Sequence, residues 1–193
     1  MAQVEDETLA ARLARYPVDQ YPVQHATTQF HLGSALLHAG ETGPARLALS
    51  AAREVFGRAG MRLEEAKAAV MLGVALRAGG RLDEAATTFA TAAVALDGLE
   101  QPAEQAAALY NLGLVRQDCA DREGAQAAWS RARVLFLSAG CVAQAAAAAR
   151  DHGGSLLTAG EVAPALALLE QSLALADQAG DEPGAGAAAN TLG

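Results

Sequence analysis

The sequence predicts an all-α solenoid of antiparallel helix pairs, and three observations support this prediction. The 193-residue chain is 52% hydrophobic but only 4% aromatic, and its apolar residues are mostly Ala and Leu, which favour helices over strands. The sequence also repeats with a period of 40 residues, without insertion or deletion. Finally, five of the six prolines stand where the repeated pattern places helix starts.

Four columns carry the repeat. A shift of 40 residues aligns small residues with small ones and large apolar residues with large ones. The columns are Gly33, Gly73, Gly113, Gly153 and Gly193; Ala45, Ala85, Ala125 and Ala165; Leu49, Phe89, Trp129 and Leu169; and Leu32, Leu72, Leu112 and Leu192, interrupted by His152. Because a mid-helix Gly costs about 1 kcal/mol relative to Ala, we interpret the Gly column as a helix crossing at which a Cβ would hold two backbones apart. Trp129 is accordingly expected in the core.

Each 40-residue unit divides into two helices. In the second unit we expect one helix over 61–78, ended by Gly79-Gly80, and another over about 83–99. The predicted segments are an N-terminal half-repeat cap (1–20), four repeats (21–60, 61–100, 101–140 and 141–180) and a partial repeat holding only a first helix (181–193). In the cap, Glu5 aligns with Ala45 and Leu9 with Leu49. Because the last segment stops within the packing motif, we expect a fragment of a longer chain or an end covered by another subunit.

Charge and composition limit the classes of partner. The formal charge is −8 with a pI near 4.9, and Lys67 is the only Lys, which argues against a nucleic-acid-binding surface. We find no signal peptide and no membrane-length apolar run, so we expect a cytoplasmic protein without membrane contact. Cys119 and Cys141 show no metal-binding spacing and are expected to be buried or half-buried thiols.

The columns resemble the tetratricopeptide repeat (TPR). Leu112-Gly113, followed by Ala125, Trp129 and Ala132, shows the pattern most clearly, and the resemblance extends over about 21–193. The 40-residue unit is longer than the usual 34 and is similar to the extended repeats of kinesin light chain, Pins-type adaptors and many bacterial regulators. The resemblance implies a right-handed superhelix in which first helices line a concave groove.

The same resemblance implies which residues face that groove. Counting from each repeated Gly gives a candidate partner-binding set: Phe30, His31, Ser34, Lys67, Val70, Met71, Val74, Arg77, Tyr110, Asn111, Leu114, Gln117, Arg150 and Asp151. Its centre is mainly apolar, which favours a protein or peptide with apolar or aromatic anchors. Some of these residues could instead pack between adjacent first helices.

Other binding modes and catalysis find less support. The paired Lys and Asn of a carboxylate clamp are missing, and Asn111 is the one remaining rung of the Asn ladder found in extended-repeat adaptors. His31 and His38 lie about 10.5 Å apart along a helix, too far for one metal ion without a further ligand. We find no nucleophile–base spacing and no phosphate-binding glycine motif, so we expect no catalytic residue, no metal and no cofactor.

The sequence therefore predicts a non-enzymatic scaffold or adaptor that binds a protein or peptide in its concave groove. Two alternatives stay open. One is a sensor or regulatory module of a larger bacterial regulator, binding a peptide or small ligand. The other is self-assembly into a homo-oligomer through the uncapped C-terminal end.

Overall fold

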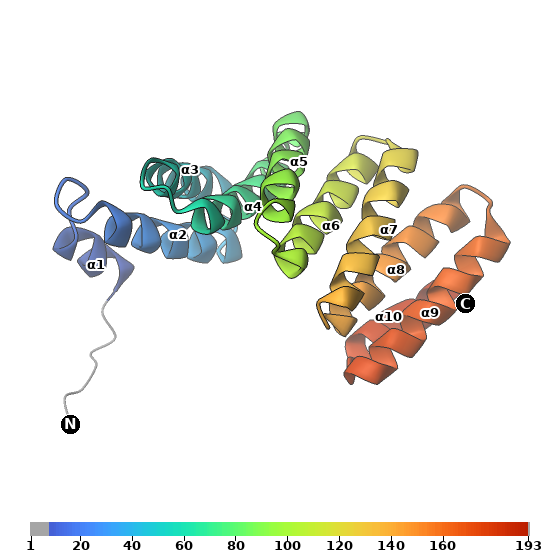
Figure 1. The fold of residues 1–193 in the computed structure, drawn as a ribbon. Coiled ribbons are helices and arrows are strands. Elements are labelled where there is room, and N and C mark those ends of the chain that lie inside the picture. Colours follow the sequence, from blue (N-terminus) through green and yellow to red (C-terminus); the bar gives the residue numbers. More distant parts are fainter. Residues whose placement is uncertain (1–7, 193) are drawn as a thin grey trace, which may run out of the picture. The chain divides into compact units, whose positions relative to one another are not determined.

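The computed structural model describes residues 8–192, and within this range the chain forms ten sequential α-helices (Figure 1). They are α1 (Leu9–Arg15), α2 (Pro22–His38), α3 (Thr42–Arg58), α4 (Arg62–Ala78), α5 (Leu82–Asp97), α6 (Pro102–Asp118), α7 (Arg122–Ser138), α8 (Val142–Thr158), α9 (Val162–Ala179) and α10 (Glu182–Leu192). The predicted all-α fold is confirmed. The expected helix over 61–78 is α4, and the expected helix over 83–99 is α5, which ends two residues earlier.

Tight turns that recur every 20 residues join the helices from α2 onward. After α2, the Gly40 N–H donates to the Leu37 carbonyl at 3.0 Å and the Glu41 N–H donates to the Leu36 carbonyl at 2.8 Å. This Schellman motif satisfies carbonyls at the helix end. Only three residues, 39–41, separate α2 from α3. The residue with positive φ is Gly40, Gly60, Gly80, Gly140, Gly160 or Gly180 in six turns, but Glu100 (φ 54°) and Ala120 (φ 61°) in the two turns that flank α6.

The repeated glycines make room for the large residue of the following helix. A Cβ built on three of them would collide with that side chain: on Gly33 with Leu49 Cγ at 2.5 Å, on Gly113 with Trp129 Nε1 at 2.5 Å and on Gly153 with Leu169 Cγ at 2.9 Å. The Ala45 carbonyl oxygen is the next obstacle at Gly33, at 3.3 Å. The expectation that these glycines let two helix backbones approach each other is thus only partly right. The atom nearest to an added Cβ belongs to the large side chain, and the backbone oxygen lies further away. Trp129 is completely buried, as predicted.

The chain forms two compact units, and the boundary between Thr88 and Phe89 falls within α5. In the first unit α2 packs on α3 and α3 on α4, around a buried cluster of Ala26, Phe56 and their neighbours. In the second unit α6 packs on α7, α7 on α8, α8 on α9, and α10 on both α9 and α8. The contact of α10 with α8 places two first helices of successive pairs beside each other.

Two sequence expectations need correction or fall outside the structure. Cys141 is half-buried, as expected. The expectation for Cys119 is wrong: this residue is exposed, because it is the C-cap residue of α6 and lies at the end of the helix rather than in the core. The N-terminal helix begins at Leu9, where the Thr8 hydroxyl accepts a hydrogen bond from the Ala11 N–H at 3.2 Å. Glu5 and Gly193, which were aligned with the repeat columns, lie outside the described residues.

None of the helices in residues 8–192 has the length and apolar character that crossing a membrane requires.

Candidate functional site

In the first unit, the candidate groove residues lie on α2 and α4. Phe30 is half-buried and packs against the Ala26–Phe56 cluster, so part of its side chain belongs to the core. Its ring meets the exposed His31 edge-on, with ring centroids 5.7 Å apart. The α4 residues Val70, Met71 and Val74 are half-buried. The remaining candidates of this unit are Ser34 and Arg77, which are half-buried, and Lys67, which is exposed.

In the second unit, the structure brings several candidates together around one pocket. This pocket has a volume of about 360 Å³ and lies between α6, α8 and α10. Four predicted residues line it, together with three that were not in the candidate set: Leu114, Gln117, Arg150 and Asp151, then Gly154, Ser155 and Thr191. We call it the α6/α8/α10 pocket. Tyr110 and Asn111 lie on α6 outside its lining.

A hydrogen-bonded cluster holds the two charged residues of the α6/α8/α10 pocket. The Tyr110 hydroxyl donates to Asp151 Oδ2 at 2.7 Å, and Arg150 donates to Asp151 Oδ1 through Nε and Nη2 at 3.0 and 2.9 Å. The Arg150 and Asp151 side chains are only 29% and 18% exposed, so their orientation is well fixed. Because the Asp151 carboxylate already accepts three hydrogen bonds, it is a positioning group and not a free general base. The guanidinium keeps N–H donors for an oxygen acceptor in the pocket.

Gly154 keeps the α6/α8/α10 pocket open. The residues at the same repeat position are Ser34, Val74 and Leu114, so the glycine is particular to α8. A Cβ built on Gly154 would meet only Thr191 Cγ2, at 4.0 Å, and packing therefore does not require glycine here. A mid-helix glycine that costs about 1 kcal/mol without a packing reason indicates a need for space.

Counting one residue on from the repeated Gly153 makes Gly154 a groove-facing position, but the candidate set above leaves it out because it has no side chain to offer a partner. The signal for the role of Gly154 was available, because Gly153 and not Gly154 occupies the repeated Gly column. Ser155 and Thr191 were missed because their contribution depends on the contact between α8 and α10. Asn111 lies on α6 as expected, but its side-chain N–H donates to the Ala107 carbonyl of its own helix at 2.8 Å, so that donor is turned away from a ligand.

Among the described residues, no group of three or more His, Cys, Asp or Glu side chains is arranged to hold a metal ion.

No protein-family model matches the sequence, and no curated protein matches it at a significant level. Solved structures match the fold. Aspartyl phosphate phosphatase F from Bacillus subtilis gives a TM-score of 0.79 at 17% identity, over 83% of this chain and 42% of that one. A Rap protein in complex with Competence and Sporulation Factor gives 0.77 at 17% identity, over 90% and 49%.

A kinesin light chain with TPR-like repeats, from Podospora anserina, gives a TM-score of 0.72 at 16% identity, over 86% of this chain and 82% of that one. These likenesses show that the fold is that of TPR-like helix pairs of about 40 residues, which confirms the resemblance seen in the sequence. The chain spans about half the length of the phosphatase and of the Rap protein.

Proposed function

We propose that this protein is a non-enzymatic scaffold that binds a peptide or a protein segment through its first helices, with the α6/α8/α10 pocket as the main site. The observation that carries the proposal is the pocket itself, in which Gly154 leaves space beside a fixed Arg150–Asp151 pair. Leu114 offers an apolar contact for an anchor side chain, and Arg150 offers donors to a peptide carbonyl or carboxylate.

The likeness to a Rap protein in complex with Competence and Sporulation Factor supports a binding function for this fold. It also favours the second candidate function, a regulatory module whose ligand changes the activity of a larger protein. Both candidates place the ligand on the first helices, and they differ in whether binding recruits a partner or alters an attached activity.

Replacing Gly154 with Leu tests the site without weakening the helix. Leu fills the corresponding position 114 and has a much higher helix propensity than Gly, so the variant should fold and lose the pocket. Proteins retained from lysate by the native chain should be lost with Gly154→Leu but kept with Ala167→Leu, a matched change at an exposed position of α9. Equal recovery by both variants, or no retained protein with the native chain, would refute the proposal.

A further inference from the structure

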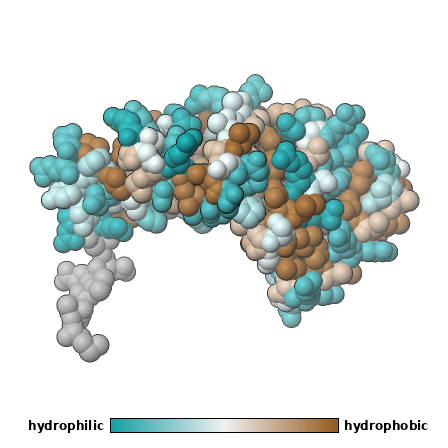
Figure 2. Space-filling model, viewed as in Figure 1, coloured by the Kyte–Doolittle hydropathy of each residue, from teal (hydrophilic) through white to brown (hydrophobic). Residues whose placement is uncertain are grey.

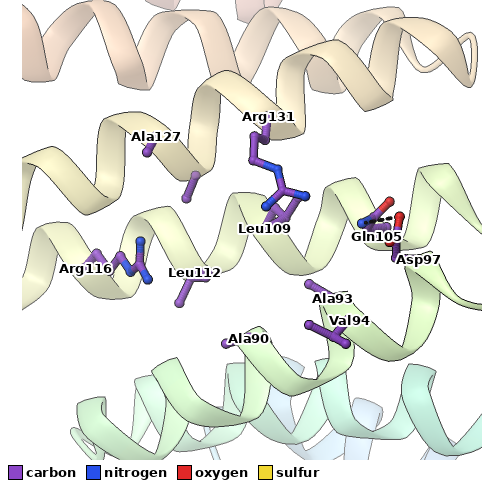
Figure 3. A pocket seen from close by; sticks show the side chains of 11 residues that line it. Ala90, Ala93, Val94, Asp97, Gln105, Leu109, Leu112, Arg116, Ala127 and Arg131 are labelled. Atoms are coloured by element: carbon purple, nitrogen blue, oxygen red, sulfur yellow. Dashed lines mark hydrogen bonds between the residues drawn. The ribbon is translucent and has the colours of Figure 1, made fainter.

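A second surface hollow lies in the groove between α5 and α7, above the outer face of α6. It has a volume of about 280 Å³ and continues into a neighbouring hollow of similar size, with which it shares Asp97, Gln105 and Arg131. Leu109 and Leu112 of α6 form its apolar floor. In Figure 3, Arg131 reaches from α7 over Leu109. None of these residues belongs to the α6/α8/α10 pocket.

A comparison of the repeats explains why no side chain of the protein fills this groove. The residues at the position of Ala93 in the other repeats are Arg53, Arg133 and Leu173, all with longer side chains. Between α7 and α9, Arg133 fills the corresponding space and donates from Nη1 to Gln171 Oε1 at 3.0 Å. In the α5/α7 groove Ala93 cannot reach across.

Among the residues that the structure describes, Arg131 lacks a hydrogen-bond partner of the kind that the equivalent residue has in the groove between α7 and α9. It stands at the repeat position of Gln171, and it makes no hydrogen bond or ion pair within residues 8–192. The other charged side chains of the groove are engaged. Asp97 accepts a hydrogen bond from the buried Gln105 at 3.1 Å, and Arg116 donates to the Gly124 carbonyl at 3.1 Å and faces Asp121.

Each flanking helix contributes one large exposed apolar side chain to the lining of these hollows. Val94 of α5 is 75% exposed and Val134 of α7 is 57% exposed. In the space-filling view, apolar surface is visible over the α7 region (Figure 2). Exposed apolar residues that border an apolar hollow are typical of a protein contact, whereas a small ligand would need only the hollow itself.

We propose that the α5/α7 groove binds an acidic amphipathic helix of a partner protein. The groove runs along α7 from Ala127 to Leu135, about 12 Å or two helical turns, which suits a short helix packed between two others. An apolar side chain of the partner occupies the space above Leu109 that Ala93 leaves open. An Asp or Glu of the partner pairs with Arg131 and so supplies the missing counterpart.

The test uses a displayed library of helix-forming peptides of about four turns, selected on the native chain. We expect enriched peptides to carry apolar residues at i, i+3 or i+4 and i+7, with Asp or Glu beside them. Ala93→Arg, which installs the residue found at positions 53 and 133, should abolish the enrichment. Val94→Glu, at an exposed position, gives the same test without altering a buried residue, and circular dichroism checks the fold of both.

Charge is tested with an enriched peptide in fluorescence anisotropy titrations. Arg131→Glu should weaken its binding at least about tenfold, and exchanging the acidic residue of the peptide for Lys should restore binding to that variant. Arg122→Glu, an exposed charge reversal at the start of α7, should have little effect. The proposal is overturned if no peptide is enriched, if Ala93→Arg and Val94→Glu keep the same peptides, or if the enriched peptides are basic.

Discussion

Two adjacent glycines in α8 should respond to alanine with opposite signs. At Gly153 a Cβ would lie 2.9 Å from Leu169 Cγ and 3.2 Å from the Ala165 carbonyl oxygen. At Gly154 the nearest atom to a Cβ would be Thr191 Cγ2, at 4.0 Å, an ordinary van der Waals contact. Both substitutions replace Gly with Ala at neighbouring positions of the same helix. The difference between their effects on the free energy of unfolding therefore reports packing alone.

The magnitudes follow from helix propensity and overpacking. Ala in place of Gly stabilises a helix interior by about 1 kcal/mol, so Gly154→Ala should raise the free energy of unfolding by about that amount. At Gly153 the same gain is opposed by overpacking, which costs about 1–3 kcal/mol, because Leu169 is completely buried and the Ala165 carbonyl is backbone. We therefore expect Gly153→Ala to be neutral or destabilising by up to about 2 kcal/mol.

Urea titrations followed by helical circular dichroism measure this difference. With a urea dependence of about 1–3 kcal/mol/M, the midpoint of Gly154→Ala should lie above that of the native chain and that of Gly153→Ala at or below it. Midpoints are the quantity to compare, because a repeat protein need not unfold in one step. If Gly154→Ala destabilises as much as Gly153→Ala, the space around Gly154 is not open and the argument for the α6/α8/α10 pocket fails.

Two further predictions concern ionisable and hydrogen-bonding groups. Burial, reinforced by the positive charge of Arg133 and opposed by Glu161, lowers the pKa of His152 below its ordinary value of 6.5. The unfolded chain therefore binds a proton at His152 more readily than the folded one, and the free energy of unfolding should fall as the pH drops below about 6.5. The substitution His152→Leu, which completes the Leu column, should lessen this fall. Urea midpoints measured from pH 7.5 to 5 test both expectations. Tyr110→Phe removes the 2.7 Å hydrogen bond to Asp151 and should cost about 1 kcal/mol at pH 7, whereas an unchanged midpoint would show that this bond contributes nothing to stability.

The fold was predictable because the repeat is uninterrupted and each signal agrees with the others. The Gly column, the large apolar column and the turn glycines all point to the same helix pairs, and Trp129 is buried where its column requires. The exposure of Cys119 was not predictable from its apolar character, because it depends on the position at which α6 ends.

The candidate site was predictable as a set of positions but not as a pocket. Counting along the repeat identified Leu114, Gln117, Arg150 and Asp151, which do line one pocket. The bond between Tyr110 and Asp151 depends on side-chain rotamers in helices one repeat apart, and no periodic pattern specifies these. The hollow beside Ala93 was visible in principle as a short side chain in a column of long ones.

The two unusual turns affect how α6 behaves over time. Glu100 and Ala120 hold a left-handed conformation that costs an L-residue about 1–2 kcal/mol, and they stand at the two ends of α6. The backbone amides near those ends should therefore exchange with solvent more readily than those of helices closed by glycine turns. Because α6 contributes to both the α6/α8/α10 pocket and the α5/α7 groove, a ligand that orders this helix from one side also lowers the entropy lost on binding at the other. Such a shared helix would make the two surfaces thermodynamically cooperative without any change of shape.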